Sequence, residues 1–177
     1  MEDVPQDEFP RYTGKVYVFS SAVSTYFAPS DPSGIGGMRH ERIRATPTWR
    51  KGAARNDCIY VVQDPDLPGF CGLLAALVLL FFSLTYEGVK FPCALVRWYS
   101  AVDDEADQET GMWIVEPDPG DEGLDVIHLD TIFRAAHLIG LAGEEFIPHI
   151  PYTEALDAFR QFYVNKYADH HAYEIVF

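Results

Sequence analysis

Apolar residues along the chain gather in short runs closed by turn residues, which is the pattern of a β-rich protein. The two longest runs cover residues 73–86 and 89–101, and Glu87 and Gly88 join them. A two-residue connection that contains glycine, set between two such runs, predicts a β-hairpin. Pro92 lies inside the second run and cannot donate a ladder hydrogen bond, so we expect an edge position or a bulge there.

Shorter runs lie on both sides of this hairpin. We expect one or two strands in residues 16–27, an extended and exposed basic segment at 38–56, and strands at 57–63, 112–115, 126–129 and 135–139, with a short turn at 130–134. The connections between them are rich in Pro, Gly, Asp and Glu, which are turn and loop residues.

A helical period occurs near the C-terminal end. It predicts an amphipathic helix at about residues 153–169, with Thr153 as its N-cap. The apolar residues that define its face are Leu156, Phe159, Tyr163 and Tyr167. We expect this face to pack across the sheet.

The predicted fold class is mainly β (α+β): a curled, mostly antiparallel sheet or small β-barrel, capped by that one C-terminal helix. At 177 residues the chain has the length of about one domain. We expect residues 1–13 to be a flexible leader and residues 14–177 to form a single β-rich domain.

Charge is unevenly distributed. The net charge of −14 disfavours unspecific attraction to DNA or to an anionic membrane. Residues 1–55 nevertheless hold eight Lys and Arg against six Asp and Glu, a charge of +2, which leaves −16 for the remainder. The basic segment is either an intramolecular complement to the acidic remainder or a loop that binds phosphate or acidic groups. Its members are Arg39, Arg42, Arg44, Arg50, Lys51 and Arg55.

The three cysteines, Cys58, Cys71 and Cys93, have no CxxC spacing and predict reduced thiols. Residues 1–10 are acidic and contain proline, unlike a secretory signal. We therefore expect an intracellular protein, with the nucleus among its compartments, that is not secreted. The longest apolar run has ten residues (73–82), too short to span a bilayer as a helix, so we expect no membrane partner.

Catalytic motifs are weak. No Gly-x-Ser-x-Gly elbow occurs, and no cysteine lies near a histidine in the sequence. His128, Asp130 and His137 could converge across neighbouring strands, which leaves a metal-dependent enzyme as one hypothesis, although their spacing does not enforce three converging ligands. We expect no cofactor and favour a protein without enzymatic activity.

Three aromatic residues are candidates for partner binding: Trp98, Tyr99 and Trp113. Aromatic cages for methylated lysine combine two to four aromatic rings, often with a carboxylate, and the acidic loops could supply the carboxylate. The alternative for Trp98 and Trp113 is packing in the core.

Several motifs together resemble a known family. They are Ala-Pro-Ser-Asp at 28–31, Arg-x-x-Pro-x-Trp at 44–49, Phe-Pro-Cys-Ala-Leu-Val-x-Trp at 91–98, Thr-Gly-Met-Trp at 110–113, Ile-His-Leu-Asp at 127–130 and Asp-His-His at 169–171. The series resembles the C-terminal region of proteins encoded by Plavaka or related KDZ-type transposons of mushroom-forming fungi, over about residues 15–175. This resemblance implies no catalytic residues.

A weaker likeness concerns the pattern of elements. Leu-Val-Arg-Trp-Tyr at 95–99, followed by a strand, a short turn and a closing strand at 126–139, is similar to BAH and Tudor-like small β-barrels of chromatin proteins. The long basic segment before Asp57 departs from the BAH pattern.

These observations favour a non-enzymatic recognition module of a transposon-derived protein, which binds a protein or chromatin partner such as a histone tail. Binding of nucleic acid through residues 39–55 is the first alternative, disfavoured by the net charge. The metal-dependent enzyme is the second.

Overall fold

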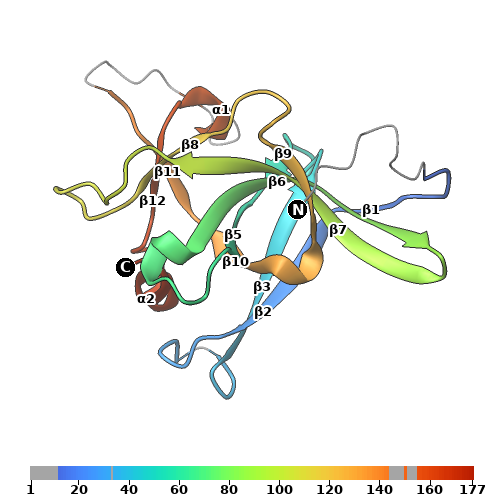
Figure 1. Cartoon of the computed structure of the whole chain (residues 1–177), viewed down its shortest axis with the longest axis horizontal. Coiled ribbons are helices and arrows are strands. Elements are labelled where there is room, and N and C mark those ends of the chain that lie inside the picture. The colour runs from blue at the N-terminus through green and yellow to red at the C-terminus, as the bar shows by residue number, and fades with distance from the viewer. Residues whose placement is uncertain (1–11, 33, 144–149, 151–154) are drawn as a thin grey trace.

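The longest elements are β6 (Leu73–Tyr86) and β7 (Val89–Ala101), which form the predicted hairpin (Figure 1). The computed structural model describes residues 12–32, 34–143, 150 and 155–177. Glu87 and Gly88 at the turn have φ angles of 50° and 80°. Two successive positive φ angles are what a type I′ hairpin turn requires. The hairpin prediction is therefore confirmed at both strands and at the turn.

At Pro92, strand β7 is paired on one side only. Pro92 is opposite Ser83 of β6, whereas the pairing of β7 with β9 (Leu124–His128) runs from Cys93 to Arg97. A missing N–H is therefore tolerated on the open side of the strand. The predicted edge position is confirmed, and the irregularity of the ladder lies elsewhere, between Val78 and Leu80.

The main sheet is antiparallel at every pairing and curls into a nearly closed barrel (Figure 1). Its order is β10-β5-β6-β7-β8-β12-β11, with β1 added to β6 and β9 to β7. The two end strands are neighbours in the chain, because only His137 separates them. The predicted mainly β, barrel-like fold is confirmed. The further strands are β1 (Tyr17–Phe19), β5 (Cys58–Val62), β8 (Ile114–Pro117), β10 (Ile132–Ala136), β11 (Leu138–Gly140) and β12 (Phe162–Val164).

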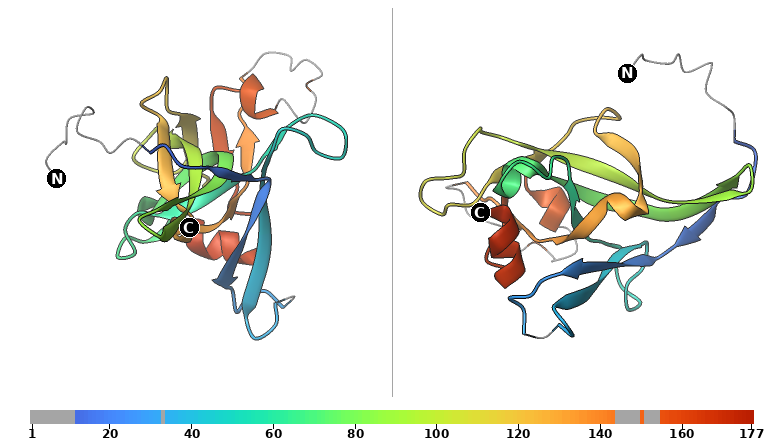
Figure 2. Two further views of the ribbon diagram at one scale, coloured as in Figure 1. Left: turned by 90° about the vertical axis from the view of Figure 1, so that its right-hand side faces the viewer. Right: turned by 60° about the horizontal axis from the view of Figure 1, so that its bottom comes forward.

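A second, three-stranded sheet consists of β2 (Ser21–Phe27), β3 (Met38–Thr46) and β4 (Arg55–Asn56). In the right-hand view of Figure 2 it lies below the long hairpin. Ile43 and Ala45 of β3 are buried against the main sheet. The basic segment 38–56, predicted to be extended and exposed, is therefore extended in β3, but its side chains there are buried at alternate positions. Ile43 and Ala45 belong to a first core with Ile59, Val78 and Val96.

A second core lies on the other face of β5, β6 and β7. It contains Tyr60, Tyr99 and Phe162. The 3₁₀ turn η2 (Gly69–Gly72) and α2 (His170–Val176) contribute buried residues to it. Gly69 has φ +59°, and a Cβ there would lie 1.6 Å from the carbonyl oxygen of Phe177, so only glycine fits this contact.

The prediction of a single helix at residues 153–169 is wrong. The structure has α1 (Ala155–Ala158), then β12, and then α2 (His170–Val176), so the C-terminal helix is shorter and begins later. The helix is interrupted because residues 162–164 pair with β8 on one side and with β11 on the other. Their sequence, Phe-Tyr-Val, is compatible with a strand. Thr153 and most of the predicted leader, residues 1–11, lie outside the described residues.

Candidate functional site

A buried arginine joins four elements of the structure. Arg134 on β10 is 3% exposed, and its guanidinium makes two hydrogen bonds to the carboxylate of Asp169, one of them 2.9 Å from Nη1 to Oδ1. Its Nε lies 3.8 Å from Oε2 of Glu41 on β3. Asp169 also accepts the backbone N–H of Ala172 and so caps α2. A two-point ion pair of this kind fixes direction as well as distance.

His171 and Tyr26 complete this network. Nη1 of Arg134 lies 3.1 Å from Nδ1 of His171, and the guanidinium lies 4.9 Å from the Tyr26 ring centroid. The imidazole stacks on Tyr26 at 4.9 Å between ring centroids. A guanidinium can only donate, so Nδ1 accepts and the imidazole is neutral with its proton on Nε2. Burial, and then the charge of Arg134, lower the pKa of His171.

We predict that this network makes stability depend on pH. The hydrogen bond from Arg134 lowers the pKa of Asp169 to about 2, and the pKa of His171 is lowered too. A group whose pKa is lower in the folded state contributes stability that is lost as the pH falls. Urea unfolding should therefore show stability falling from about pH 6.5 for His171, by at most about 1.4 kcal/mol per pH unit, and again below about pH 4 for Asp169.

The control is His171→Gln, which keeps an acceptor for Arg134 but cannot titrate. This variant should lose the dependence between pH 6.5 and 5 and keep the fall below pH 4. Equal slopes for the two proteins between pH 6.5 and 5 would contradict the assignment.

Three arginines of the basic segment surround one indole ring. The guanidinium carbons of Arg44, Arg55 and Arg50 lie 4.5, 5.3 and 5.4 Å from the ring centroid of Trp49. A guanidinium over the face of an indole is attracted by the ring quadrupole. Trp49 is therefore the centre of the basic segment.

Carboxylates compensate only part of this positive charge. Asp57 accepts a hydrogen bond from Nε of Arg55 at 2.8 Å and from the backbone N–H of Arg44 at 2.9 Å. The Nη1 of Arg42 donates to the hydroxyl of Ser21, and the Nη1 of Arg44 donates to a backbone carbonyl. Within the described residues, Arg42, Arg44 and Arg50 have no carboxylate partner.

The loop after Trp49 holds its basic residues in an unfavourable backbone conformation. Arg50 and Lys51 have φ angles of 49° and 64°, which side chains other than glycine rarely adopt. Backbone hydrogen bonds from Trp49 to Ala53 and from Gly52 to Trp49 close this turn. Local strain of this kind is common where a side chain must be presented for binding.

Two hollows adjoin along this surface and together form what we call the arginine groove. One, of about 520 Å³, is lined by Trp49, Arg50 and Arg55. The other, of about 620 Å³, extends past Arg42 and Arg44 to Arg134. The hollows share Arg55, Asn56, Asp57 and Leu156 in their walls.

The structure divides the six predicted basic residues. Arg42, Arg44, Arg50 and Arg55 line the groove, and Lys51 is exposed in the adjoining loop. Arg39 does not line it, and pairs with Asp31 at 3.2 Å.

The three predicted aromatic residues do not share a pocket. Trp98 and Tyr99 are consecutive in β7 and so point to opposite faces of the sheet. Trp98 packs on the first core, whereas Tyr99 lies in the second. Trp113 also packs on the second core, with its ring 5.5 Å from Phe70. A common aromatic cage is therefore not formed, because the sheet separates Trp98 from the other two.

Because both tryptophans pack on core clusters, we predict that Trp98→Ala and Trp113→Ala mainly reduce stability. Each should lower the free energy of unfolding by about 2–3 kcal/mol, less than for a fully buried aromatic residue. Urea unfolding followed by circular dichroism measures this loss. Unchanged stability in both variants would contradict the core role and would favour partner binding by Trp98 and Trp113.

The predicted histidine cluster is not assembled. His128 accepts from the backbone N–H of Asp130 in the turn η3 (Leu129–Thr131), and its Nδ1 lies 3.4 Å from the Asp130 carboxylate. His137 follows β10 and contacts Asn165 instead. Over the described part of the chain, no three His, Cys, Asp or Glu side chains are placed to hold a metal ion. Burial raises the pKa of the Cys58 thiol to about 12, so this thiol is a poor nucleophile.

Tyr60 carries a buried hydroxyl without a hydrogen-bond partner among the described residues. Its ring belongs to the second core, and Tyr60 is opposite Arg134 in the pairing of β5 with β10. Burial raises the pKa of this phenol above its usual range. An unpaired buried hydroxyl costs free energy that a phenyl ring does not.

We predict that Tyr60→Phe raises the free energy of unfolding by about 1 kcal/mol, because it removes that unpaired group. Chemical denaturation measures the change, and Tyr99→Phe in the same core is the matched control. A loss of stability on Tyr60→Phe would show that the hydroxyl has a partner.

No family model, curated protein or solved structure matches this chain. The likenesses to Plavaka or KDZ-type proteins and to BAH or Tudor-like barrels therefore stay predictions. Among the described residues, no helix has the length and apolar character needed to cross a bilayer.

Proposed function

We propose that this protein is a non-enzymatic recognition module that binds an acidic segment of a partner protein in the arginine groove. One observation carries the proposal: Arg42, Arg44 and Arg50 lie at the groove without a carboxylate partner among the described residues, in a chain whose net charge is −14. Cations left uncompensated in so acidic a chain favour an anionic ligand.

Carboxylate side chains suit this surface better than isolated anions. A guanidinium presents parallel N–H groups that match the two oxygens of a carboxylate. Trp49 lies against Arg44, Arg50 and Arg55 and limits their freedom before a ligand arrives. A restrained side chain loses less entropy on binding.

Nucleic acid is the second candidate, because arginine side chains can bind a phosphate backbone and an aromatic ring such as that of the half-buried Trp49 can stack on bases. The acidic remainder of the chain, with a charge of −16, counts against a long polyanion. The resemblance to transposon-encoded proteins would make the acidic partner a chromatin protein and the compartment the nucleus.

We predict that a peptide of twelve residues rich in Glu and Asp binds the protein at low salt and quenches or shifts tryptophan fluorescence. Its affinity should fall with salt, because the contacts are between charges. Arg44→Gln with Arg50→Gln should weaken binding at least about tenfold, the equivalent of one lost charged hydrogen bond. Lys90→Gln, at the tip of the long hairpin, is the control and should leave the affinity unchanged.

Arg50→Gly separates binding from folding. Glycine tolerates the φ of 49°, so this variant should stay as stable as the natural protein and still lose affinity for the peptide. An equal affinity for a peptide with Gln and Asn in place of Glu and Asp would contradict the proposal. Binding of a 20-base-pair duplex or a single strand, without binding of the peptide, would favour the nucleic-acid function instead.

A further inference from the structure

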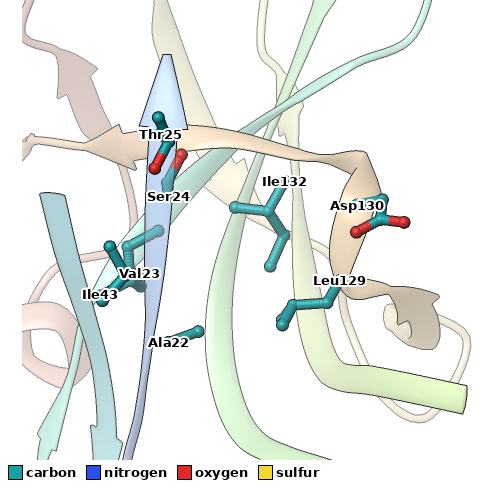
Figure 3. Close-up of a pocket in the computed structure, with 8 residues that line it drawn as sticks. All are labelled: Ala22, Val23, Ser24, Thr25, Ile43, Leu129, Asp130 and Ile132. Atoms are coloured by element: carbon teal, nitrogen blue, oxygen red, sulfur yellow. The ribbon is translucent and has the colours of Figure 1, made fainter. Parts of the chain in front are cut away.

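A small hollow lies between β2 and the turn η3, on the side of the second sheet that faces the first core (Figure 3). Ile43 points into it, and side chains alternate along a strand, so Arg42 and Arg44 point the other way. The hollow is therefore distinct from the arginine groove. Its walls are Ala22, Val23, Ser24, Thr25, Ile43, Leu129, Asp130 and Ile132.

The floor of the hollow is aliphatic. Ile43, which is 1% exposed, belongs to the first core, and Ala22, Leu129 and Ile132 pack against that core. The volume is about 230 Å³. An apolar cavity of about 150 Å³ is enough to take a benzene molecule, so this space is large enough for one branched aliphatic group.

The rim of the hollow carries one acidic side chain. The hydroxyl of Ser24 donates to the carbonyl of Phe133, and that of Thr25 contacts His40. Asp130, by contrast, has a side chain that is 90% exposed, and no Lys or Arg lines the hollow. The neighbour of this carboxylate is His128, whose Nδ1 lies 3.4 Å away and also accepts the backbone N–H of Asp130.

We propose that this hollow binds a branched aliphatic group that carries a positive charge a few bonds away. The source is a basic segment of a partner protein, in which Leu, Ile or Val is next to Lys or Arg. The aliphatic floor would bury the side chain, and the carboxylate of Asp130 would receive the cation. The net charge of −14 attracts such a segment. This inference does not depend on the arginine groove.

The test is a methyl NMR titration with 3-methylbutylammonium, which has the proposed shape and charge. Two probes of the same carbon skeleton are compared with it: 3-methylbutanol, which is neutral, and 3-methylbutanoate, which is negative. We expect shifts at the methyl groups of Ala22, Ile43 and Leu129, and none at Val164 in the second core. The ammonium should bind about two- to fivefold more tightly than the alcohol, since water screens an ion pair with a carboxylate that is 90% exposed.

Two variants decide the result. Ala22→Leu fills the hollow and should abolish the shifts. Asp130→Asn keeps the shape and should reduce the preference for ammonium over alcohol to about one, while Glu122→Gln, an exposed acid that does not line the hollow, should leave that preference unchanged. The Asp130 variant covers the case in which leucine is too large to fit. Equal affinities for all three probes, or shifts that persist in a folded Ala22→Leu protein, would overturn the proposal.

Discussion

The buried guanidinium of Arg134 is the interaction on which the rest of the structure depends. A cation in the interior is stable only when it is paired and hydrogen-bonded, and removing one partner of such a pair costs about 3–5 kcal/mol. Arg134 meets this requirement with Asp169, Glu41 and His171, which come from the start of α2, from β3 and from α2 itself. Elements far apart in the chain are thereby fixed to β10.

Both candidate sites follow from this arrangement. Glu41 also accepts the backbone N–H of Ala135 at 3.0 Å, so β3 is held directly against β10. With β3 fixed, its alternation sends Ile43 to the aliphatic hollow and Arg42 and Arg44 to the arginine groove. One strand therefore contributes to two surfaces of opposite chemical character, while the loop after Trp49 lines the remaining part of the arginine groove.

The sequence predicts well what local residues decide. The long hairpin is predicted because Gly88 and two β-rich runs determine it locally. The prediction of one C-terminal helix fails because Phe162 and Tyr163 fit the apolar pattern of a helix as well as that of a strand. Only a tertiary feature, the space between β8 and β11, selects the strand. The separation of Trp98 from Tyr99 could have been foreseen, since neighbours in a strand face opposite ways. Arg134, alone in an apolar run, could have been noticed, but its partner Asp169 lies 35 residues further on and has no local signal.

The two proposed sites also differ in the physics that would drive binding. At the arginine groove the attraction is between charges at a half-exposed surface, where dissolved salt screens it within about 10 Å. At the hollow, a bound aliphatic side chain would leave water, and this contribution, about 25 cal/mol per Å² of apolar surface buried, is hardly weakened by salt. The groove needs Trp49 to restrain its arginines, whereas the hollow needs only the space beside Ala22 that a larger residue would fill. A chain that is strongly acidic overall can thus offer an acidic ligand one surface and a basic ligand another, because each attraction acts over a short distance.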